Sequence, residues 1–325
     1  MKSKKIRLIA ALCAAVIAAA LVCVRVFAPA QVTRINFPTA ATTGTLYPLG
    51  AAFAKLWNES VPDVQVTAQA SGGGVDNLNF LREGEAQVSM AVTSIAWQSQ
   101  HGTDTFEGKP DAKLRILAGL YYNPNQVVAT RASGIESLAD IAGKRFAPGA
   151  PGSTTVGETE LHLTRAGVAY PDGFSAQFVG FNEAIDLMRN RQLDGAWIMA
   201  GIPTAAVSEI CSTADGRLVP VDDEVIASLQ AEYPWYVPFT IPAGTYAGQD
   251  EDVQTTAVRM VLMASSDVSD EVAYQLVKTL WENMEKISEN FAALKGLQVE
   301  DAATGIAEIP LHDGAAKYYR EIGVL

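Results

Sequence analysis

Two stretches of the chain share one pattern of hydrophobic and polar positions. Residues 74–92 and 181–199 coincide when the first stretch is moved along the chain by 107 positions. Each has a polar turn, an amphipathic helix, a short polar joint and a closing apolar run, which is typical of a helix followed by a buried strand. Upstream, residues 42–47 and 151–155 are small-residue turns that each open a helix. The repeat predicts two similar α/β lobes.

The same pattern predicts most of the remaining elements. Strands are expected over residues 34–38, 64–68, 87–92, 115–121, 126–130, 145–147, 177–180, 218–221 and 253–264. Helices are expected over residues 48–58, 75–83, 94–100, 153–166, 223–231, 269–290 and 315–321, with Ser269 as the cap of the longest helix. The break at 123–125 separates two of these strands, and the second is expected to cross into the second lobe.

These elements predict a two-lobed α/β fold in which the ligand lies in the cleft between two Rossmann-like lobes. Residues 31–125 and 238–325 are expected to form lobe 1, and residues 126–237 lobe 2. Residues 236–241 are extended and flanked by proline, so they are expected to be the return strand of a two-strand hinge. In open α/β sheets, ligands bind beyond the strand ends, where helix N-termini converge.

Composition and charge narrow the class of protein. Hydrophobic residues make up 49% of the 325 residues and charged residues 18%, which is typical of a globular chain. The formal net charge is −12, and no basic cluster lies beyond the N-terminus. Binding to nucleic acid is therefore not expected. A monomer is expected.

The N-terminus has the features of an export signal. Basic residues precede an apolar run over residues 8–24, and Ala28-Pro29-Ala30 is a small-x-small cleavage site. Residues 1–30 are therefore expected to be a signal peptide, or a retained membrane anchor, of a periplasmic or otherwise extracytoplasmic protein. Only Cys211 lies beyond this segment, so no internal disulfide is expected.

The turns carry the candidate chemistry. Helix N-termini after Gly44, Gly74, Thr93, Gly152 and Gly201 should offer free N–H groups and hydroxyls to a carboxylate or another small anion. The expected ligand-binding residues are Thr43, Gly44, Thr45, Tyr47, Ser71, Gly72, Gly73, Gly74, Asn77, Thr93, Ser94, Trp97, Tyr122, Ser153, Thr154, Thr155 and Gly201.

Catalysis, metals and cofactors are not indicated by the sequence. No Gly-x-Ser-x-Gly elbow and no Cys-His metal spacing occur, and the glycine-rich turn at 71–74 lacks the Gly-Lys-Ser/Thr of a nucleotide-binding loop. The chain is therefore expected to bind a solute and not to be an enzyme.

Several motifs are similar to those of one receptor family. They are TGTLYPLG (43–50), SGGGVDNL (71–78), REGEA (82–86), LADIAGKR (138–145), APGAPGS (147–153), AGIPT (200–204), IPAGTY (241–246) and LHDGAA (311–316). With these motifs the chain resembles the TAXI (TRAP-associated extracytoplasmic immunogenic) solute receptors. These are the binding subunits of tripartite ATP-independent periplasmic (TRAP) transporters. The resemblance covers nearly all of the chain beyond residue 30.

The resemblance implies a type II periplasmic-binding-protein fold with two hinge crossings. It implies delivery of the solute to TRAP-type membrane permease subunits, and ligands such as glutamate-like amino acids or 2-oxoglutarate-like dicarboxylates. Where the family often has Gln-Ser-Asp, this chain has Thr93-Ser94-Ile95. The missing acidic group favours an organic acid over an amino acid. A sensory receptor that signals to a membrane partner remains open as an alternative function.

Overall fold

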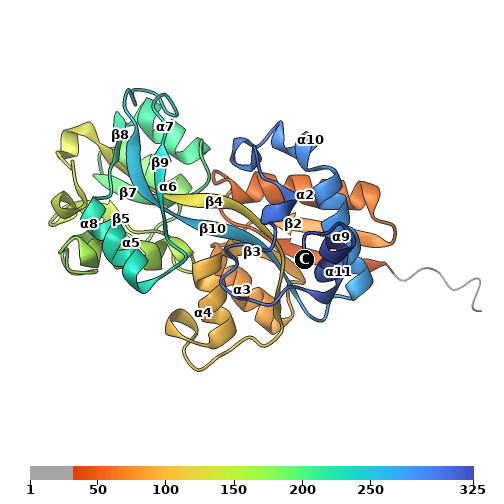
Figure 1. The fold of residues 1–325 in the computed structure, drawn as a ribbon. Coiled ribbons are helices and arrows are strands. Elements are labelled where there is room, and N and C mark those ends of the chain that lie inside the picture. The colour runs from red at the N-terminus through yellow and green to blue at the C-terminus, as the bar shows by residue number, and fades with distance from the viewer. Residues whose placement is uncertain (1–31) are drawn as a thin grey trace, which may run out of the picture. The chain divides into compact units, whose positions relative to one another are not determined.

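The computed structural model describes residues 32–325, and the expected signal segment lies outside these residues. Strands and helices alternate at the start of the described chain, forming the first lobe (Figure 1). Its elements are β1 (Thr33–Pro38), α2 (Leu46–Ser60), β2 (Val64–Gln69), α3 (Gly74–Glu83), β3 (Val88–Val92) and α4 (Thr93–His101). The strands β1 and β2 form a two-stranded ribbon. The Ser89 hydroxyl, on β3, donates to the Pro38 carbonyl at 2.8 Å and ties this ribbon to β3.

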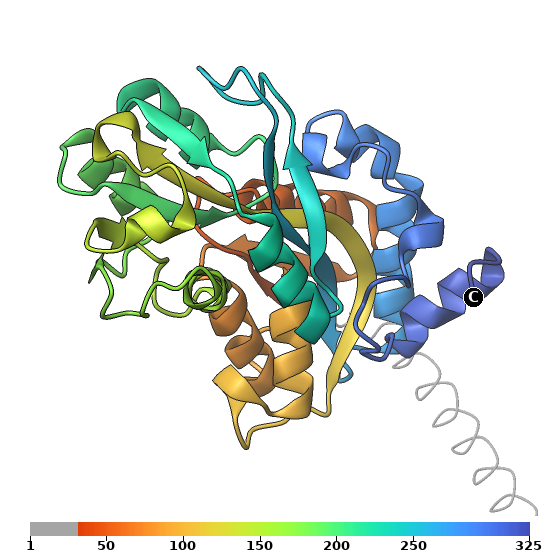
Figure 2. The same ribbon diagram turned by 60° about the vertical axis from the view of Figure 1, so that its left-hand side comes forward.

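Two long strands connect the lobes. β4 (Leu114–Thr130) and β10 (Val253–Ser265) pair antiparallel. β10 also pairs with β3 of the first lobe, whereas the second half of β4 pairs with two strands of the second lobe, β7 (Gly195–Met199) and β8 (Gly216–Val219). Figure 2 shows both long strands passing between the two groups of helices. The resulting eight-stranded sheet of residues 32–325 is therefore shared by the lobes.

The second lobe contains the helices and short strands between these crossings. Besides β7 and β8 it holds β5 (Arg145–Ala147), α5 (Thr154–Arg165), β6 (Ser175–Ala176), α6 (Phe181–Arg189), α7 (Ala205–Thr213) and α8 (Asp223–Glu232). β9 (Val237–Ile241) then pairs antiparallel with β10. This two-lobed arrangement confirms the expected fold class. The exact lobe boundaries stay a prediction.

The C-terminal helices pack against the first lobe. They are α9 (Asp270–Glu282), α10 (Met284–Ser288) and α11 (Asp313–Glu321). The indole of Trp57, on α2, donates to the Leu276 carbonyl on α9 at 2.9 Å. Ser269 caps α9 as expected, because its hydroxyl accepts the Val272 N–H. Within residues 32–325 no helix combines the length and the apolar character that a membrane crossing needs.

The predicted repeat is confirmed by the positions of the elements. Moving α3 and β3 along the chain by 107 residues gives the starts of α6 and β7, and the two strands then coincide from end to end. Each repeated strand pairs antiparallel with one crossing strand, β3 with β10 and β7 with β4. The two units therefore occupy equivalent places in the two lobes.

Three expectations about element boundaries were wrong. The expected break at 123–125 does not occur, because Pro124 lies where β4 exchanges β10 for β7 as its partner, so its missing N–H interrupts neither ladder. The long helix expected over 269–290 ends at Glu282, because the Asn283 amide bonds back to the Thr279 carbonyl at 2.9 Å and competes with the helix. The strand expected over 177–180 lies earlier, at β6.

Asn77 fastens the glycine turn to the sheet. It is fully buried in the first turn of α3, and its Nδ2 donates to the carbonyls of Thr39 at 2.7 Å and Met90 at 2.9 Å. Its Oδ1 accepts the Ser71 hydroxyl at 2.7 Å. Each polar atom of this amide therefore already has a partner within the fold, so the amide is not free for the ligand contact expected of Asn77.

We expect Asn77→Ala to destabilise the protein by about 2–4 kcal/mol, since it leaves two buried carbonyl groups without a donor. Chemical denaturation monitored by circular dichroism measures the change. The matched control is Asn79→Ala, two residues later on the partly exposed side of the same helix, for which we expect less than about 1 kcal/mol. Equal effects of the two substitutions would show that Asn77 does not hold the turn.

Candidate functional site

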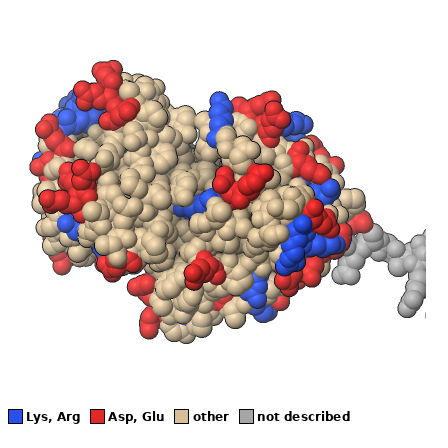
Figure 3. Space-filling view, in the orientation of Figure 1, with Lys and Arg blue, Asp and Glu red and all other residues tan. Residues whose placement is uncertain are grey.

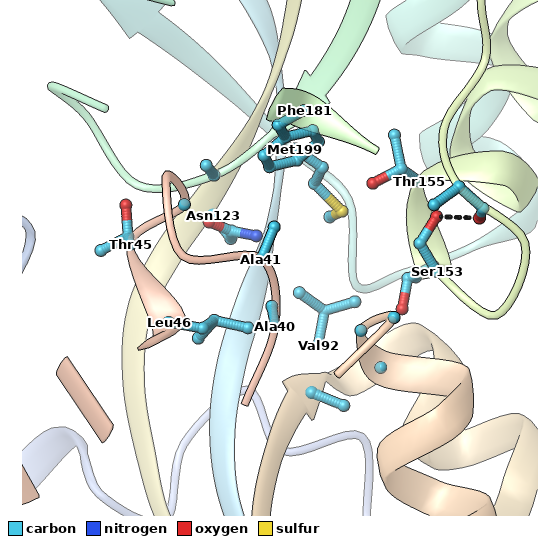
Figure 4. A pocket seen from close by; sticks show the side chains of 18 of the residues that line it. Ala40, Ala41, Thr45, Leu46, Val92, Asn123, Ser153, Thr155, Phe181 and Met199 are labelled. Atoms are coloured by element: carbon cyan, nitrogen blue, oxygen red, sulfur yellow. Dashed lines mark hydrogen bonds between the residues drawn. The ribbon is translucent and has the colours of Figure 1, made fainter. Parts of the chain in front are cut away.

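A cavity of about 70 Å³ lies between the two lobes, and we call it the first cavity (Figure 4). It is lined by Ala40, Ala41, Gly44, Thr45, Leu46, Gly72, Gly73, Gly74, Ala91, Val92, Asn123, Ala150, Ser153, Thr154, Thr155, Gly180, Phe181, Met199, Ala200 and Met260. No charged side chain is among these described lining residues. Figure 3 shows charged atoms gathered over both ends of this face, with smaller patches of both signs in its middle.

Four helices begin at this cavity. The residues that precede them are Thr45 for α2, Gly73 for α3, Ser153 for α5 and Gly180 for α6, and at none of these described ends does the side chain accept a capping hydrogen bond. The first N–H groups of a helix have no partner within the helix, and the helix dipole places partial positive charge there. The four ends therefore direct backbone N–H donors at a cavity with no charged side chain in its described lining, although Asp76 and Glu183 lie in the first turns of α3 and α6.

Glycine allows the two lobes to approach closely at this point. Gly73 has a φ of +124°, which other residues rarely adopt. A Cβ on Gly74 would come within 2.3 Å of the Thr154 hydroxyl oxygen, across the cavity in the second lobe. Only a residue without a side chain fits here while the lobes are in contact.

The internal repeat lines both sides of the cavity. The 107-residue shift relates Gly73 to Gly180 and Gly74 to Phe181, and all four residues line the cavity. The same shift relates Val92 to Met199, at the ends of β3 and β7, and this pair lines it too. The cavity therefore lies where the equivalent ends of the two repeats meet.

Asn123 supplies a polar side chain that sequence reasoning missed. It is 3% exposed, lines the first cavity from β4, and its Oδ1 has no hydrogen-bond partner within residues 32–325. A buried amide oxygen without a donor is costly unless another group donates a hydrogen bond to it. In the sequence, Asn123 belongs to the Asn-Pro-Asn stretch at 123–125, which predicts a break between two strands. The structure instead places this stretch within one strand.

Eight of the residues expected at the ligand do line the first cavity. They are Gly44, Thr45, Gly72, Gly73, Gly74, Ser153, Thr154 and Thr155. Others near it hold the lobes together. The Thr45 hydroxyl donates to the Gly201 carbonyl at 3.0 Å, and that of Thr43 donates to Asn182. Ser71 binds Asn77, as described above.

The remaining expected residues lie elsewhere. Thr93 is fully buried and Tyr47 half-buried, and neither is among the described lining residues. Trp97 stacks on His101, with ring centroids 4.1 Å apart. Tyr122 is 38% exposed and its ring lies against the guanidinium of Arg259. Ser94 lines a second cavity, which also contains Glu158.

Glu158 is a buried carboxylate that the sequence did not single out. It lies on α5 and is 2% exposed. Its Oε2 accepts the Asn125 amide at 3.0 Å and the Tyr236 hydroxyl at 2.9 Å, while the Ser94 hydroxyl reaches Oε1 at 3.5 Å. Because Asn125 belongs to crossing strand β4, this carboxylate connects the second lobe to the hinge.

His162 completes the network one helical turn later. Its Nδ1 contacts the Glu158 carbonyl and its Nε2 contacts the Thr256 hydroxyl on β10, each at 2.7 Å. Burial raises the pKa of Glu158 to about 7, although its hydrogen bonds to Asn125, Tyr236 and Ser94 oppose the shift. Burial also lowers the pKa of His162 to about 4. Both shifts favour the neutral forms.

A metal centre is not indicated by the side chains. Within the described part of the chain, no three His, Cys, Asp or Glu residues are grouped so that they could hold a metal ion. The arrangement of donors without charge suits reversible binding of a small anion.

We expect Glu158→Gln to gain stability relative to the parent protein as the pH rises. The raised pKa of Glu158 means that its contribution is fully present below about pH 4.5 and is lost as the pH approaches 7, by up to about 3 kcal/mol. Glutamine keeps the shape and cannot ionise. Denaturant unfolding of both proteins from pH 4 to 8 measures the difference.

His162 acts in the opposite sense in the parent protein. Its lowered pKa gives stability that is present above about pH 6.5 and is lost as the pH falls through 4. Between pH 4.5 and 6.5 the contributions of Glu158 and His162 to the stability of the parent protein should therefore oppose each other. A constant difference between the Glu158→Gln variant and the parent over this range would contradict the buried, proton-binding carboxylate.

Several solved structures are similar to this chain. A protein from Bordetella bronchiseptica RB50 has a TM-score of 0.54 at 16% identity, covering 90% of this chain and 89% of that chain. An ancestral arginine-binding protein bound to arginine has a TM-score of 0.51 at 13% identity, covering 80% and 99%. The alkanesulfonate-binding protein of Xanthomonas axonopodis pv. citri, bound to MOPS, has a TM-score of 0.47 at 16% identity, covering 87% and 85%.

The first two similarities support the type II fold of two-lobed binding proteins, as expected. The family itself is identified from the sequence: residues 37–323 match the NMT1-like family, and the chain belongs to it.

Proposed function

We propose that this protein is an extracytoplasmic solute receptor that captures a small carboxylate-bearing compound, an organic anion or an amino acid, in the first cavity. The observation that carries the proposal is the convergence of four helix N-termini without side-chain caps on one cavity with no charged residue in its described lining. Such an end is suited to a carboxylate because its N–H donors and dipole both favour negative charge.

The lining also limits the size and charge of the bound group. The cavity volume of about 70 Å³ suits a group of a few heavy atoms. Polyanions are usually held by Arg or Lys, and neither occurs among the described residues of the lining. A single carboxylate with a short apolar neighbour, placed against Val92, Phe181 and Met199, satisfies these conditions.

Closure of the lobes is the proposed mechanism of capture. The Asp76 N–H donates to the Gly152 carbonyl at 3.1 Å, and Thr45 donates to Gly201, so contacts between lobes surround the cavity. A ligand that touches both lobes has its full set of contacts only in the closed state, and so shifts the population towards it. A membrane partner can then distinguish the loaded receptor by its shape.

The partner and the location rest on the sequence. The motifs shared with the TAXI receptors support a TRAP-type permease as the partner, and the N-terminal segment supports export. A transport assay tests the partner: the receptor should stimulate uptake by a cognate TRAP permease in proteoliposomes under an ion gradient. Uptake that needs ATP hydrolysis instead would contradict this partner class.

The ligand class is tested by a thermal-shift screen of organic acids and amino acids, followed by calorimetry. We expect Asn123→Asp to weaken binding of each compound found by about a hundredfold or more, because it places a negative charge of the same shape beside the bound carboxylate. The control is Asn190→Asp on the exposed end of α6, which changes net charge equally and should leave affinity unchanged. Tight carboxylate binding by Asn123→Asp would place the site elsewhere.

We expect Gly74→Ala to hinder closure while each lobe stays folded. The added Cβ meets the Thr154 hydroxyl of the opposite lobe, so the closed state loses population and apparent affinity falls by about tenfold. Small-angle scattering at saturating ligand should give a larger radius of gyration than for the parent protein.

The rescue variant for this experiment is Gly74→Ala combined with Thr154→Ala, which removes the obstructing hydroxyl. We expect the compact, closed form to return in the double variant. If Gly74→Ala closes as fully as the parent, the contact between Gly74 and Thr154 is not a condition of closure.

A further inference from the structure

A second cavity, of about 400 Å³, adjoins the first. Ser153 and Thr154 line both cavities, so the two meet at the start of α5. Its walls come from α4, α5, Phe178 and the segment 233–236 that leads into β9. Because the first cavity holds only a few atoms, the rest of a larger ligand has this adjoining space available.

The second cavity differs from the first in the chemistry of its walls. Glu158 and Glu160 line it, and no Lys, Arg or His occurs among its described lining residues. The Oε1 atom of Gln98 is buried and has no hydrogen-bond partner within residues 32–325. Oε1 of Glu158 has only the long 3.5 Å contact to Ser94. Two acceptor oxygens therefore lack a close donor.

Aromatic rings form much of the remaining wall. Tyr233 and Trp235 lie with ring centroids 5.5 Å apart, and Tyr236 and the exposed Phe178 also line the cavity. The faces of such rings attract cations. The Tyr233 ring already faces the Arg165 guanidinium, 5.5 Å from the ring centroid. The acceptors without donors, the acidic groups and the remaining rings favour a positively charged donor group over an anion.

We propose that the second cavity binds the ammonium group of a zwitterionic ligand, with Glu158 and Gln98 as its acceptors and the aromatic wall around it. This inference rests on the proposed function, in which the ligand's carboxylate occupies the first cavity. The proposed ammonium site favours amino acids within the proposed ligand class. This differs from the sequence-based expectation of an organic acid, which was based on Ile95 at a position where the TAXI receptors often have Asp. An ammonium group here would also touch the carboxylate that binds Asn125 of the hinge, so recognition and closure share one residue.

The test compares amino acids with the acids that lack only the ammonium group. The pairs are L-glutamate and glutarate, L-aspartate and succinate, L-leucine and 4-methylpentanoate, and L-phenylalanine and 3-phenylpropanoate. Calorimetry is run at pH 8, where the Glu158 carboxyl is ionised. For each pair that binds, we expect the amino acid to bind at least about tenfold more tightly than its partner.

Two variants assign this preference to the cavity. Glu158→Gln should remove most of the preference, because it weakens binding of the amino acid more than binding of the acid without the ammonium group; its effect on closure through Asn125 applies to both ligands and cancels in the ratio. Gln98→Leu should reduce the preference by about threefold to tenfold. Glu160→Gln is the matched variant on the same helix, where the side chain is exposed; because Glu160 also lines the cavity, it should reduce the preference, but by less than Glu158→Gln.

The outcomes separate the two proposals. Binding of an acid as tightly as its amino acid partner, or a preference that survives both Glu158→Gln and Gln98→Leu, overturns the ammonium site and leaves the carboxylate receptor standing. A preference lost in Glu160→Gln alone overturns the assignment to Glu158. Binding of no member of any pair counts against the carboxylate receptor, and with it the ammonium site. If Glu158→Gln fails to fold, a preference in the parent that does not fall between pH 8 and 6 overturns the role of this carboxylate.

Discussion

The antiparallel pairing of β4 with β10 is the constraint on which the two-lobed structure depends. Both strands belong to both lobes, and one amide, Asn125, fixes their relation at the middle. Its Nδ2 donates to Thr256 on β10 and to Glu158 on α5, both at 3.0 Å, and its Oδ1 accepts the Trp197 indole at 2.8 Å. A side chain with every polar atom engaged holds its position strongly, because a buried polar group left without its partner is costly. The helix that carries Ser153 and Glu158 is thereby oriented against the hinge.

Much of the fold could be predicted because it follows from local pattern. The repeat of helix and strand, the glycine turns and the cap at Ser269 are each set by residues close in sequence. The errors at Pro124 and Asn283 arise because the outcome there depends on contacts that the sequence pattern does not show. A proline normally ends a strand, but here it falls where the strand changes partners, which only the assembled sheet decides. An asparagine within an apolar helix pattern is a weak signal, and its bond to the Thr279 carbonyl is visible only in the structure.

The candidate site was predictable to a similar extent. Turns that open helices can be recognised from glycine and hydroxyl residues, and eight of the expected residues line the first cavity. Side chains that reach the site from a strand or from a later turn of a helix could not be recognised in this way. Asn123 resembled a strand break, and Glu158 resembled one more polar residue on an amphipathic helix. Conversely, Asn77 was expected to contact the ligand, but its amide donates to two carbonyls of its own lobe. It holds the glycine turn in place, a structural role that the sequence pattern does not distinguish from ligand binding.

The two cavities differ in the origin of their polar groups, and the proposed ligand would meet each of them with a different charge. In the first, donors come largely from backbone at helix ends, so a carboxylate can be held without a countercharge that would need its own solvation. In the second, acceptors come from side chains, and the most buried of them has a pKa near 7, raised by burial. A cation beside this carboxyl would favour its ionised form, which burial alone disfavours. Burial of Glu158 beside the hinge therefore suits a site that must both hold a ligand and release it.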